Sequence, residues 1–299
     1  MLLPRVLLAQ LGDADSAPLT SNAEAGFAGG KCLKEGFARP AMRRSVDMQN
    51  MQKLKPADRL FVALDLVDLE RAVAVARALA GHIGGIKLGK EFFTANGPEG
   101  YRRIAELGLP IFLDLKYHDI PTTVARAVRA ALPLHPFMLD VHASGGAAMM
   151  RAAAEAAAEA GMQAGGVPSR GRPLVVAVTV LTSLHQADFE FLGISRSLQE
   201  QATRLAELAK QCGLDGAVCS CSELMALRGA CGADFVLVVP GIRPGWAQDD
   251  EHRRTITPAE AIALGADYIV VGRPIVQAPD PADAAARVCE EMARVLPQD

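Results

Sequence analysis

The segment from Phe112 to Pro121 brings two carboxylates and an ammonium close together in the sequence. Asp114 and Lys116 are two residues apart, so on a β-strand their side chains point to the same face. Asp119 follows three residues after Lys116, where we expect the strand to have turned into a loop. An ammonium between carboxylates favours the charged form of each group, and such clusters are candidate functional sites. A structural salt bridge is the alternative, because the D-x-K-x-x-D spacing alone does not identify a reaction.

Residues near the C-terminus have the features of a phosphate-binding site. Gly272 and Arg273 follow an apolar run, and backbone N–H groups at the start of a short helix there would attract an anion. The guanidinium groups of Arg243 and Arg273 can add charge-assisted hydrogen bonds. We interpret the polar residues 245–254 as a loop that closes over the site. The alternative is two surface arginines beside a glycine turn.

The elements that position these residues follow an alternating pattern from Leu60 onward. Short β-branched and Leu-rich runs are followed by Ala-rich stretches with charged residues at helical spacing. Continuous apolar strands that alternate with helices indicate a parallel sheet covered on both faces. The eight runs are Leu60–Leu64, Gly85–Leu88, Pro110–Leu113, Phe137–Val141, Leu174–Val180, Gly216–Cys219, Phe235–Val239 and Tyr268–Val271.

Eight such units in about 240 residues predict an α/β fold, the closed (β/α)8 or TIM barrel, whose active sites form at the carboxyl ends of the strands. An open doubly wound sheet is the alternative. That fold usually has a G-x-G-x-x-G motif after its first strand, whereas here Asp65 and Leu66 follow the first run. Predicted helices are Leu69–Ala80, Pro98–Leu107, Thr122–Ala131, Gly146–Ala160, Ser197–Cys212, Ser222–Arg228, Pro258–Leu264 and Pro281–Val295, with N-caps at Asp68, Ser222, Thr257 and Asp280.

Composition limits the classes of partner. The chain of 299 residues has 31 Lys and Arg against 34 Asp and Glu, a net charge of −3. This balance argues against a general binder of nucleic acid or of membrane surfaces. A membrane-spanning helix would need a run of about eighteen apolar residues, and the sequence contains no such run. The six cysteines include no C-x-x-C pair, so we expect no zinc site and reduced thiols in a cytoplasmic protein.

The first part of the chain differs from the rest. Residues 1–55 are rich in Gly, Ala, Ser and Asp and have no sustained period of a helix or a strand. We predict a disordered N-terminal extension there and a single barrel domain over residues 56–299. One hypothesis is that translation starts at Met48 or Met51. The intact mass of the native protein tests it, and a mature chain that begins at Met1 would refute it.

Seven segments in chain order resemble the bacterial type of the orotidine 5'-phosphate decarboxylase family, over about Leu60 to Val295. They are VALDL, IKLGKEFF, FLDLKYHDIPTT, VHASGG, VTVLTS, PGIRP and YIVVGRPI. The resemblance implies an enzyme without cofactor or metal that converts orotidine 5'-phosphate to UMP and CO2, the last step of de novo pyrimidine synthesis. It also implies a homodimer whose active sites lie at the subunit interface.

The same resemblance implies roles for single residues. Lys116 would be the catalytic proton donor with Asp114 beside it, and Asp119 would reach into the partner's site. The substrate-binding residues would be Asp65 and Lys87 at the ribose, Thr123 across the interface, Thr182 and Ser183 near the pyrimidine, and Arg243, Gly272 and Arg273 at the phosphate.

His252 departs from the bacterial pattern, which has a phosphate-contacting Gln in the closing loop. A histidine can donate a hydrogen bond and carry charge near neutral pH, so closure would persist with a pH dependence that the Gln enzymes lack. An alignment shifted by a residue or two is the alternative. Two other functions remain open: a magnesium-dependent sugar-phosphate decarboxylase or aldolase of the same superfamily, and a barrel that binds nucleotide phosphates without catalysis.

Overall fold

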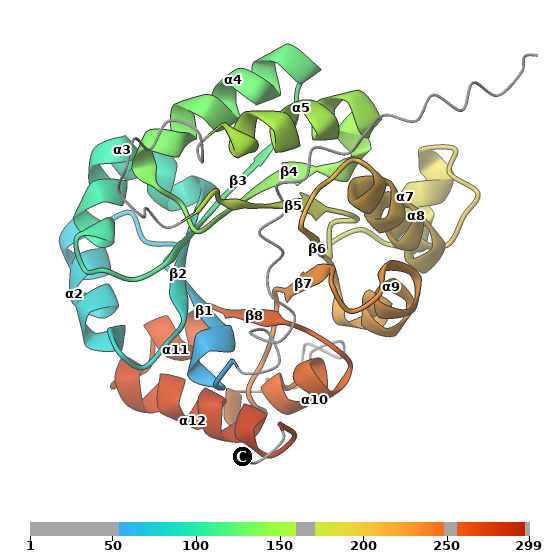
Figure 1. Cartoon of the computed structure of the whole chain (residues 1–299). Coiled ribbons are helices and arrows are strands. Elements are labelled where there is room, and N and C mark those ends of the chain that lie inside the picture. The colour runs from blue at the N-terminus through green and yellow to red at the C-terminus, as the bar shows by residue number, and fades with distance from the viewer. Residues whose placement is uncertain (1–53, 160–170, 248–255, 297–299) are drawn as a thin grey trace, which may run out of the picture. The chain divides into compact units, whose positions relative to one another are not determined.

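The computed structural model describes residues 54–159, 171–247 and 256–296. In this part of the chain, eight parallel strands close into a barrel in chain order (Figure 1). The predicted (β/α)8 fold is therefore confirmed. The strands are β1 (Leu60–Ala63), β2 (Gly85–Gly89), β3 (Ile111–Tyr117), β4 (Met138–His142), β5 (Leu174–Val178), β6 (Gly216–Val218), β7 (Val236–Val239) and β8 (Tyr268–Val271).

Helices surround the barrel on its outside (Figure 1). They are α2 (Leu69–Leu79), α3 (Lys90–Ala105), α4 (Pro121–Ala131), α5 (Gly146–Ala158), α7 (Gln186–Phe191), α8 (Leu198–Gln211), α9 (Leu224–Cys231), α10 (Pro258–Ala263), α11 (Arg273–Val276) and α12 (Pro281–Ala293). Short 3-10 turns are η1 (Ala57–Arg59), η2 (Leu132–Leu134), η3 (Ala143–Gly145), η4 (Cys221–Glu223) and η5 (Gly245–Ala247). None of the helices in the described part of the chain is long and apolar enough to cross a bilayer.

Three of the four predicted N-caps are confirmed. The side chains of Asp68, Thr257 and Asp280 accept hydrogen bonds from backbone N–H groups in the first turns of α2, α10 and α12. The prediction for Ser222 was wrong, because Ser220 and Glu223 form a capping box two residues earlier and open η4. The α9 helix then begins at Leu224.

The α3 helix begins at Lys90, earlier than the predicted Pro98. Gly97 lies inside it with a positive φ of 57°, which marks a kink. The proline disfavours helical geometry in the residue before it, and glycine adopts the required conformation without a steric penalty. The pattern from Pro98 onward thus indicated only the second half of a kinked helix.

Each strand is buried on both faces, which explains the continuous apolar runs. On β1, Leu60 and Val62 belong to the layer between the strands and the helices, whereas Phe61 and Ala63 belong to the barrel interior. The interior is filled by Phe61, Ala63, Phe112, Met138, Val176, Val178, Val218, Val236, Val238, Tyr268 and Val270. This packed interior supports the carboxyl ends of the strands, where the polar residues follow.

Two ion pairs fix the amino ends of neighbouring strands. Asp215 accepts hydrogen bonds from Arg172 (2.6 and 2.8 Å) and from the backbone N–H of Val175 on β5 (2.8 Å). Asp267 accepts from Arg228 (2.7 Å) and from the N–H of Leu237 on β7 (2.8 Å). In (β/α)8 barrels, residues at the amino ends of the strands contribute to stability, whereas the active site lies at the carboxyl ends.

The close approach of β6 and β7 gives a testable prediction. A Cβ at Gly216 would lie 2.2 Å from the carbonyl oxygen of Val236. We expect Gly216→Ala to reduce the free energy of unfolding by about 2–3 kcal/mol, the cost of overpacking. Gly229→Ala is the matched control, because Gly229 lies within α9 with open space around it. The control should stabilise by about 0.5–1 kcal/mol, measured by urea unfolding; equal shifts in both variants would contradict the prediction.

Candidate active site

Five ionisable side chains meet towards the carboxyl ends of β1 to β4. The Lys87 ammonium lies 3.3 Å from Asp65 Oδ1 and 3.1 Å from Asp114 Oδ2. The Lys116 ammonium forms an ion pair with Asp114 Oδ1 and lies 3.9 Å from Asp140 Oδ2. The groups therefore form a chain in which acids and amines alternate, with Asp114 between two lysines.

The contact between Asp114 and Lys116 depends on an irregular backbone. Lys116 has a positive φ of 52°, and the pairing of β3 with β4 shifts register between Leu113 and Tyr117. The backbone N–H of Lys116 donates to Asp140 Oδ1 at 2.8 Å. The two side chains meet as the spacing predicted, but they do so across a local distortion rather than by regular strand alternation.

Burial and pairing set the charge of the two central groups. Burial alone would raise the pKa of Asp114, but the charge of Lys87, a hydrogen bond with Asp140 and the charge of Lys116 hold it well below its usual range. Burial alone would lower the pKa of Lys87, and the nearby charges of Asp114 and Asp65 more than offset this, so its pKa is raised. At neutral pH, Asp114 is thus an anion and Lys87 a cation.

Two residues of this cluster were absent from the sequence-based site. Asp140 is fully buried in the middle of β4, and a carboxylate within the apolar run Phe137–Val141 was the signal that could have found it. Gly89 leaves room for the cluster, since a Cβ there would lie 2.9 Å from both Asp65 Oδ1 and Lys87 Nζ. No local pattern indicates that requirement, because it arises from the packing of β1 against β2.

Within the described part of the chain, neither Asp119 nor Thr123 forms an ion pair or hydrogen bond with the cluster. Both are exposed, and Asp119 Oδ1 accepts a hydrogen bond from the N–H of Ile120 at 2.6 Å. Both residues belong to the segment that opens α4, and the Ile120 side chain beside them is 63% exposed.

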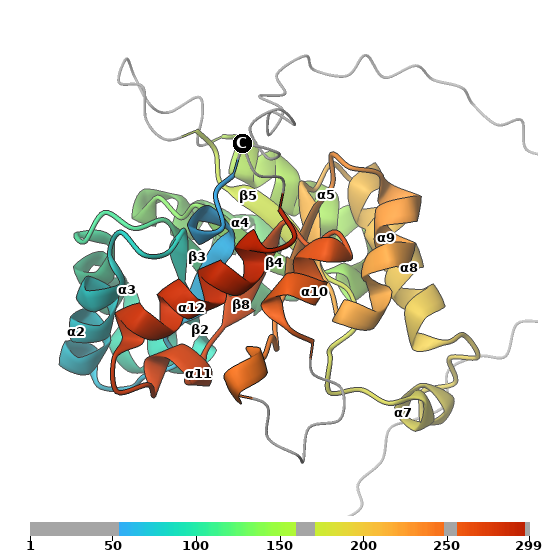
Figure 2. The same ribbon diagram turned by 90° about the horizontal axis from the view of Figure 1, so that it is seen from below.

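The remaining candidates lie on loops that follow β5, β7 and β8. Thr182 and Ser183 are exposed between β5 and α7. Gly272 caps α11, which begins at Arg273, and the Arg273 side chain is exposed. Figure 2 shows α7 and α11 at the same end of the barrel. Arg243 is half-buried, and its backbone N–H donates to Ile256 at 3.0 Å.

The start of the predicted closing loop is attached to α12. The N–H of Gly245 donates to Glu291 Oε1 at 3.2 Å, and the Arg287 guanidinium lies 4.3 Å from the ring centre of Trp246. His252 lies outside the described residues, so its proposed role stays a prediction.

Two histidines pack beside the cluster. The rings of His118 and His142 have centroids 5.2 Å apart. Burial, followed by the charges of His118, Lys90 and Lys116, lowers the pKa of His142 to about 4. His142 is therefore neutral near pH 7.

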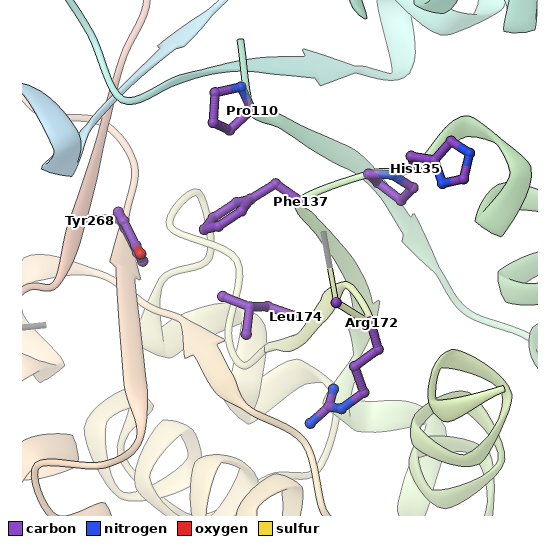
Figure 3. A pocket seen from close by; sticks show the side chains of 8 residues that line it. Pro110, His135, Phe137, Arg172, Leu174 and Tyr268 are labelled. Atoms are coloured by element: carbon purple, nitrogen blue, oxygen red, sulfur yellow. The ribbon is translucent and has the colours of Figure 1, made fainter. Parts of the chain in front are cut away.

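A cavity of about 320 Å³ lies at the other end of the barrel (Figure 3). Phe137, Leu174 and Tyr268 point toward this space (Figure 3), and the rings of Phe137 and Tyr268 pack edge to face at 6.0 Å. Its lining contains none of the candidate residues of the charged cluster, so the two sites are separate.

A (β/α)8 barrel with a charged cluster at the carboxyl ends of its strands has the arrangement of the barrel enzymes, whose active sites lie at that end. Comparison with known proteins narrows this class. A profile of the "Orotidine 5'-phosphate decarboxylase / HUMPS family" matches residues 58–288. The chain belongs to this family.

Individual relatives agree with this placement. The chain is 51% identical to an orotidine 5'-phosphate decarboxylase of Paramagnetospirillum magneticum over 233 residues, which is 78% of this chain and 97% of the relative. It is 48% identical to one of Rhodospirillum rubrum, over 78% of this chain and 93% of the relative. A crystal structure of orotidine 5'-phosphate decarboxylase from Lactobacillus acidophilus aligns with a TM-score of 0.67 and 35% identity, covering 78% of this chain and 98% of that one.

Pairing within the cluster gives a second prediction. Lys87→Met removes an ammonium from between two carboxylates, so we expect the free energy of unfolding at pH 7 to fall by about 3 kcal/mol. Arg103→Met is the matched control, because its pair with Glu70 is exposed; it should change stability by less than about 1 kcal/mol.

The loss in Lys87→Met should depend on pH. The lowered pKa of Asp114 contributes stability above the pKa of an unfolded aspartate, and this contribution disappears as the pH falls through the folded-state value. The difference between wild type and Lys87→Met should therefore shrink in acid. Urea unfolding between about pH 3 and 7 measures this, and a difference that grows in acid would contradict it.

Proposed function

We propose that this protein decarboxylates orotidine 5'-phosphate to UMP and CO2, the last step of UMP biosynthesis, with Lys116 as the proton donor. The observation that carries the proposal is the Lys116 ammonium paired with Asp114 at the mouth of the barrel. Membership of the family and relatives of that name at about half identity support the substrate and the reaction. The protein is accordingly a carboxy-lyase.

The geometry suits a reaction driven by electrostatics. Loss of CO2 breaks the bond from C6 of the pyrimidine to its carboxyl carbon and leaves the electron pair on C6. No neighbouring carbonyl delocalises that pair in the usual way, so a fixed positive charge has to stabilise it. The Lys116 ammonium supplies this charge and then transfers a proton to C6, and solvent reprotonates the amine.

Asp114 and Asp119 have supporting roles in this scheme. Asp114 keeps Lys116 charged and fixes its direction, since the two are ion-paired. A carboxylate near the substrate carboxylate also disfavours the bound ground state. Asp119 would add a second carboxylate from the partner subunit.

The other candidate residues bind the parts of the substrate that do not react. Asp65 and Lys87 take the ribose hydroxyls, and Thr123 contacts the substrate across the interface. Thr182 and Ser183 lie near the pyrimidine, whereas Arg243, Gly272 and Arg273, with His252 from the closing loop, hold the phosphate. Binding energy from the remote phosphate can then assemble the site around C6.

Lys87 favours this reaction over the magnesium-dependent alternative. Its ammonium lies 3.3 Å from Asp65 and 3.1 Å from Asp114, so it occupies the space between carboxylates that a divalent cation would need. The cluster also argues against a barrel that only binds nucleotides, because binding a phosphate does not require an ammonium buried among carboxylates.

We further propose that the protein is a homodimer and acts in the cytoplasm. Asp119 and Thr123 are exposed beside the apolar Ile120, which supports their use by a neighbouring subunit. Apolar surface next to polar residues is typical of protein interfaces.

An absorbance assay with orotidine 5'-phosphate tests the function. We expect the pyrimidine absorbance to decrease with wild type, also in the presence of EDTA. Lys116→Ala should lower kcat by at least about 1,000-fold, because it removes both the charge and the proton donor, while circular dichroism stays that of the folded protein. A wild-type enzyme without turnover, or a Lys116→Ala variant that keeps it, would falsify the assignment.

Mixing two inactive variants tests the shared site. Lys116→Ala and Asp119→Ala should each be inactive as homodimers. After dissociation and reassociation at equal amounts, half of the dimers pair the two chains, and one site in each is intact, so about a quarter of wild-type activity should return. The sum of the separate activities, with no gain on mixing, would show that Asp119 does not act across an interface.

A further inference from the structure

Asp140 is a buried carboxyl group next to Lys116, which with Asp114 forms the catalytic pair. The residue is 0% exposed in the middle of β4. Its Oδ1 accepts a hydrogen bond from the backbone N–H of Lys116 at 2.8 Å. Its Oδ2 is buried, and no residue in the described part of the chain donates a hydrogen bond to it; the Lys116 ammonium is 3.9 Å away.

An anion at Asp140 would upset the charge balance of the cluster. The ammonium groups of Lys87 and Lys116 are already matched by the carboxylates of Asp65 and Asp114. A third carboxylate without a partner on one oxygen would carry the full cost of burying a charge.

A proton on Oδ2 removes this difficulty. A hydrogen bond between the carboxyl groups of Asp140 and Asp114 contributes to the pKa shifts of both groups, and two carboxyl groups can share such a bond only when one of them carries a proton. Burial, and then the negative charge of Asp114, raise the pKa of Asp140 well above its usual range. The proton belongs to Asp140, since Asp114 faces both lysines.

The other oxygen of Asp140 supports an unfavourable backbone conformation. A positive φ at a residue with a side chain costs about 1–2 kcal/mol, and Lys116 has a φ of 52°. The hydrogen bond from its N–H to Asp140 Oδ1 fixes the residue where the pairing of β3 with β4 is interrupted. Asp140 thus contacts both the backbone of Lys116 and the side chain of Asp114.

We propose that Asp140 is a positioning residue that works as a neutral carboxylic acid: it accepts from the N–H of Lys116 and donates its proton to Asp114. It orients both members of the catalytic pair and does not itself contact the substrate. This inference rests on the proposed function for its effect on turnover, but the protonation and the hydrogen bonds can be tested without it.

Two substitutions of similar size separate this role from a simple packing role. In Asp140→Asn, the amide oxygen can accept from Lys116 and the amide NH2 can donate to Asp114, so kcat should stay within about threefold of wild type. Asp140→Leu loses both hydrogen bonds. We expect its kcat to fall about 100-fold, the scale of a misplaced catalytic group, with little change in KM.

Asp215→Leu is the matched control at the other end of the barrel. Asp215 is likewise a carboxylate that accepts from a backbone N–H, but it lies at the amino ends of the strands. Its loss should lower the melting temperature and leave kcat per folded molecule unchanged. A similar loss of kcat in Asp215→Leu and Asp140→Leu would mean that general destabilisation, and not positioning, explains the effect, and would overturn the proposal.

Infrared spectroscopy and stability report the protonation state independently of activity. At neutral pH, wild type should show the C=O band of a buried carboxylic acid that is absent from Asp140→Asn. Because the folded-state pKa of Asp140 is raised, its contribution to stability is present below the unfolded pKa and is lost as the pH rises. Asp140→Asn should therefore melt higher than wild type at pH 7, and this advantage should vanish below about pH 4.

The outcomes distinguish this inference from the proposed function. An inactive wild type would refute the function, while the infrared band and the pH-dependent stability would still decide on the neutral acid. An active wild type with a fully active Asp140→Leu would overturn the positioning role alone. Loss of activity in Asp140→Asn, together with no acid band in wild type, would show that an anion is needed and overturn the proposal. If Asp140→Leu does not fold, the activity of Asp140→Asn and the acid band of wild type decide it.

Discussion

The ion pairs of Asp114 with Lys87 and Lys116 are the interaction on which the rest of the site depends. Asp114 is 8% exposed and Lys87 9% exposed, and charged groups so little exposed are tolerated only when they are paired. An alternating arrangement of acids and amines meets this requirement, but it demands that side chains from four neighbouring strands converge. A barrel provides that convergence, since all its strands end at one rim.

The two ends of the barrel divide stability and chemistry between them. At the amino ends, Asp215 and Asp267 each bind an arginine and a backbone N–H of a neighbouring strand. These ion pairs and hydrogen bonds hold the strands together. The packed interior side chains fill the space between the two ends of the barrel. They support the opposite end, where the Lys116 backbone has a positive φ and the ionisable cluster is buried. Distorted backbone of this kind persists only where its surroundings fix it.

The sequence determined the barrel more completely than the site. Continuous apolar runs predicted every strand to within a few residues, because a strand that is buried on both faces consists almost entirely of apolar residues. The approach of Asp114 to Lys116 was likewise a local property. The left-handed backbone of Lys116 was not predictable, since it depends on a shift of register against β4, and the start of α3 was missed because a kink at Gly97 interrupts the pattern. The roles of Asp119, Thr123 and the loop residues stay predictions, since they concern a partner chain or a bound substrate.

Asp114 and Asp140 show why residue type alone could not assign the site. Both are aspartates within neighbouring strands, β3 and β4, and both are nearly or fully buried. Asp114 faces two ammonium groups, so its charged form is stabilised. Asp140 is fully buried and faces the charge of Asp114, so its neutral form is favoured even though it accepts a hydrogen bond from the N–H of Lys116. Environments that move the pKa values of two like groups apart assign them different work: the charged one can orient an ammonium at the reacting atom, and the neutral one can donate a hydrogen bond and hold the backbone without adding charge that would repel an anionic substrate.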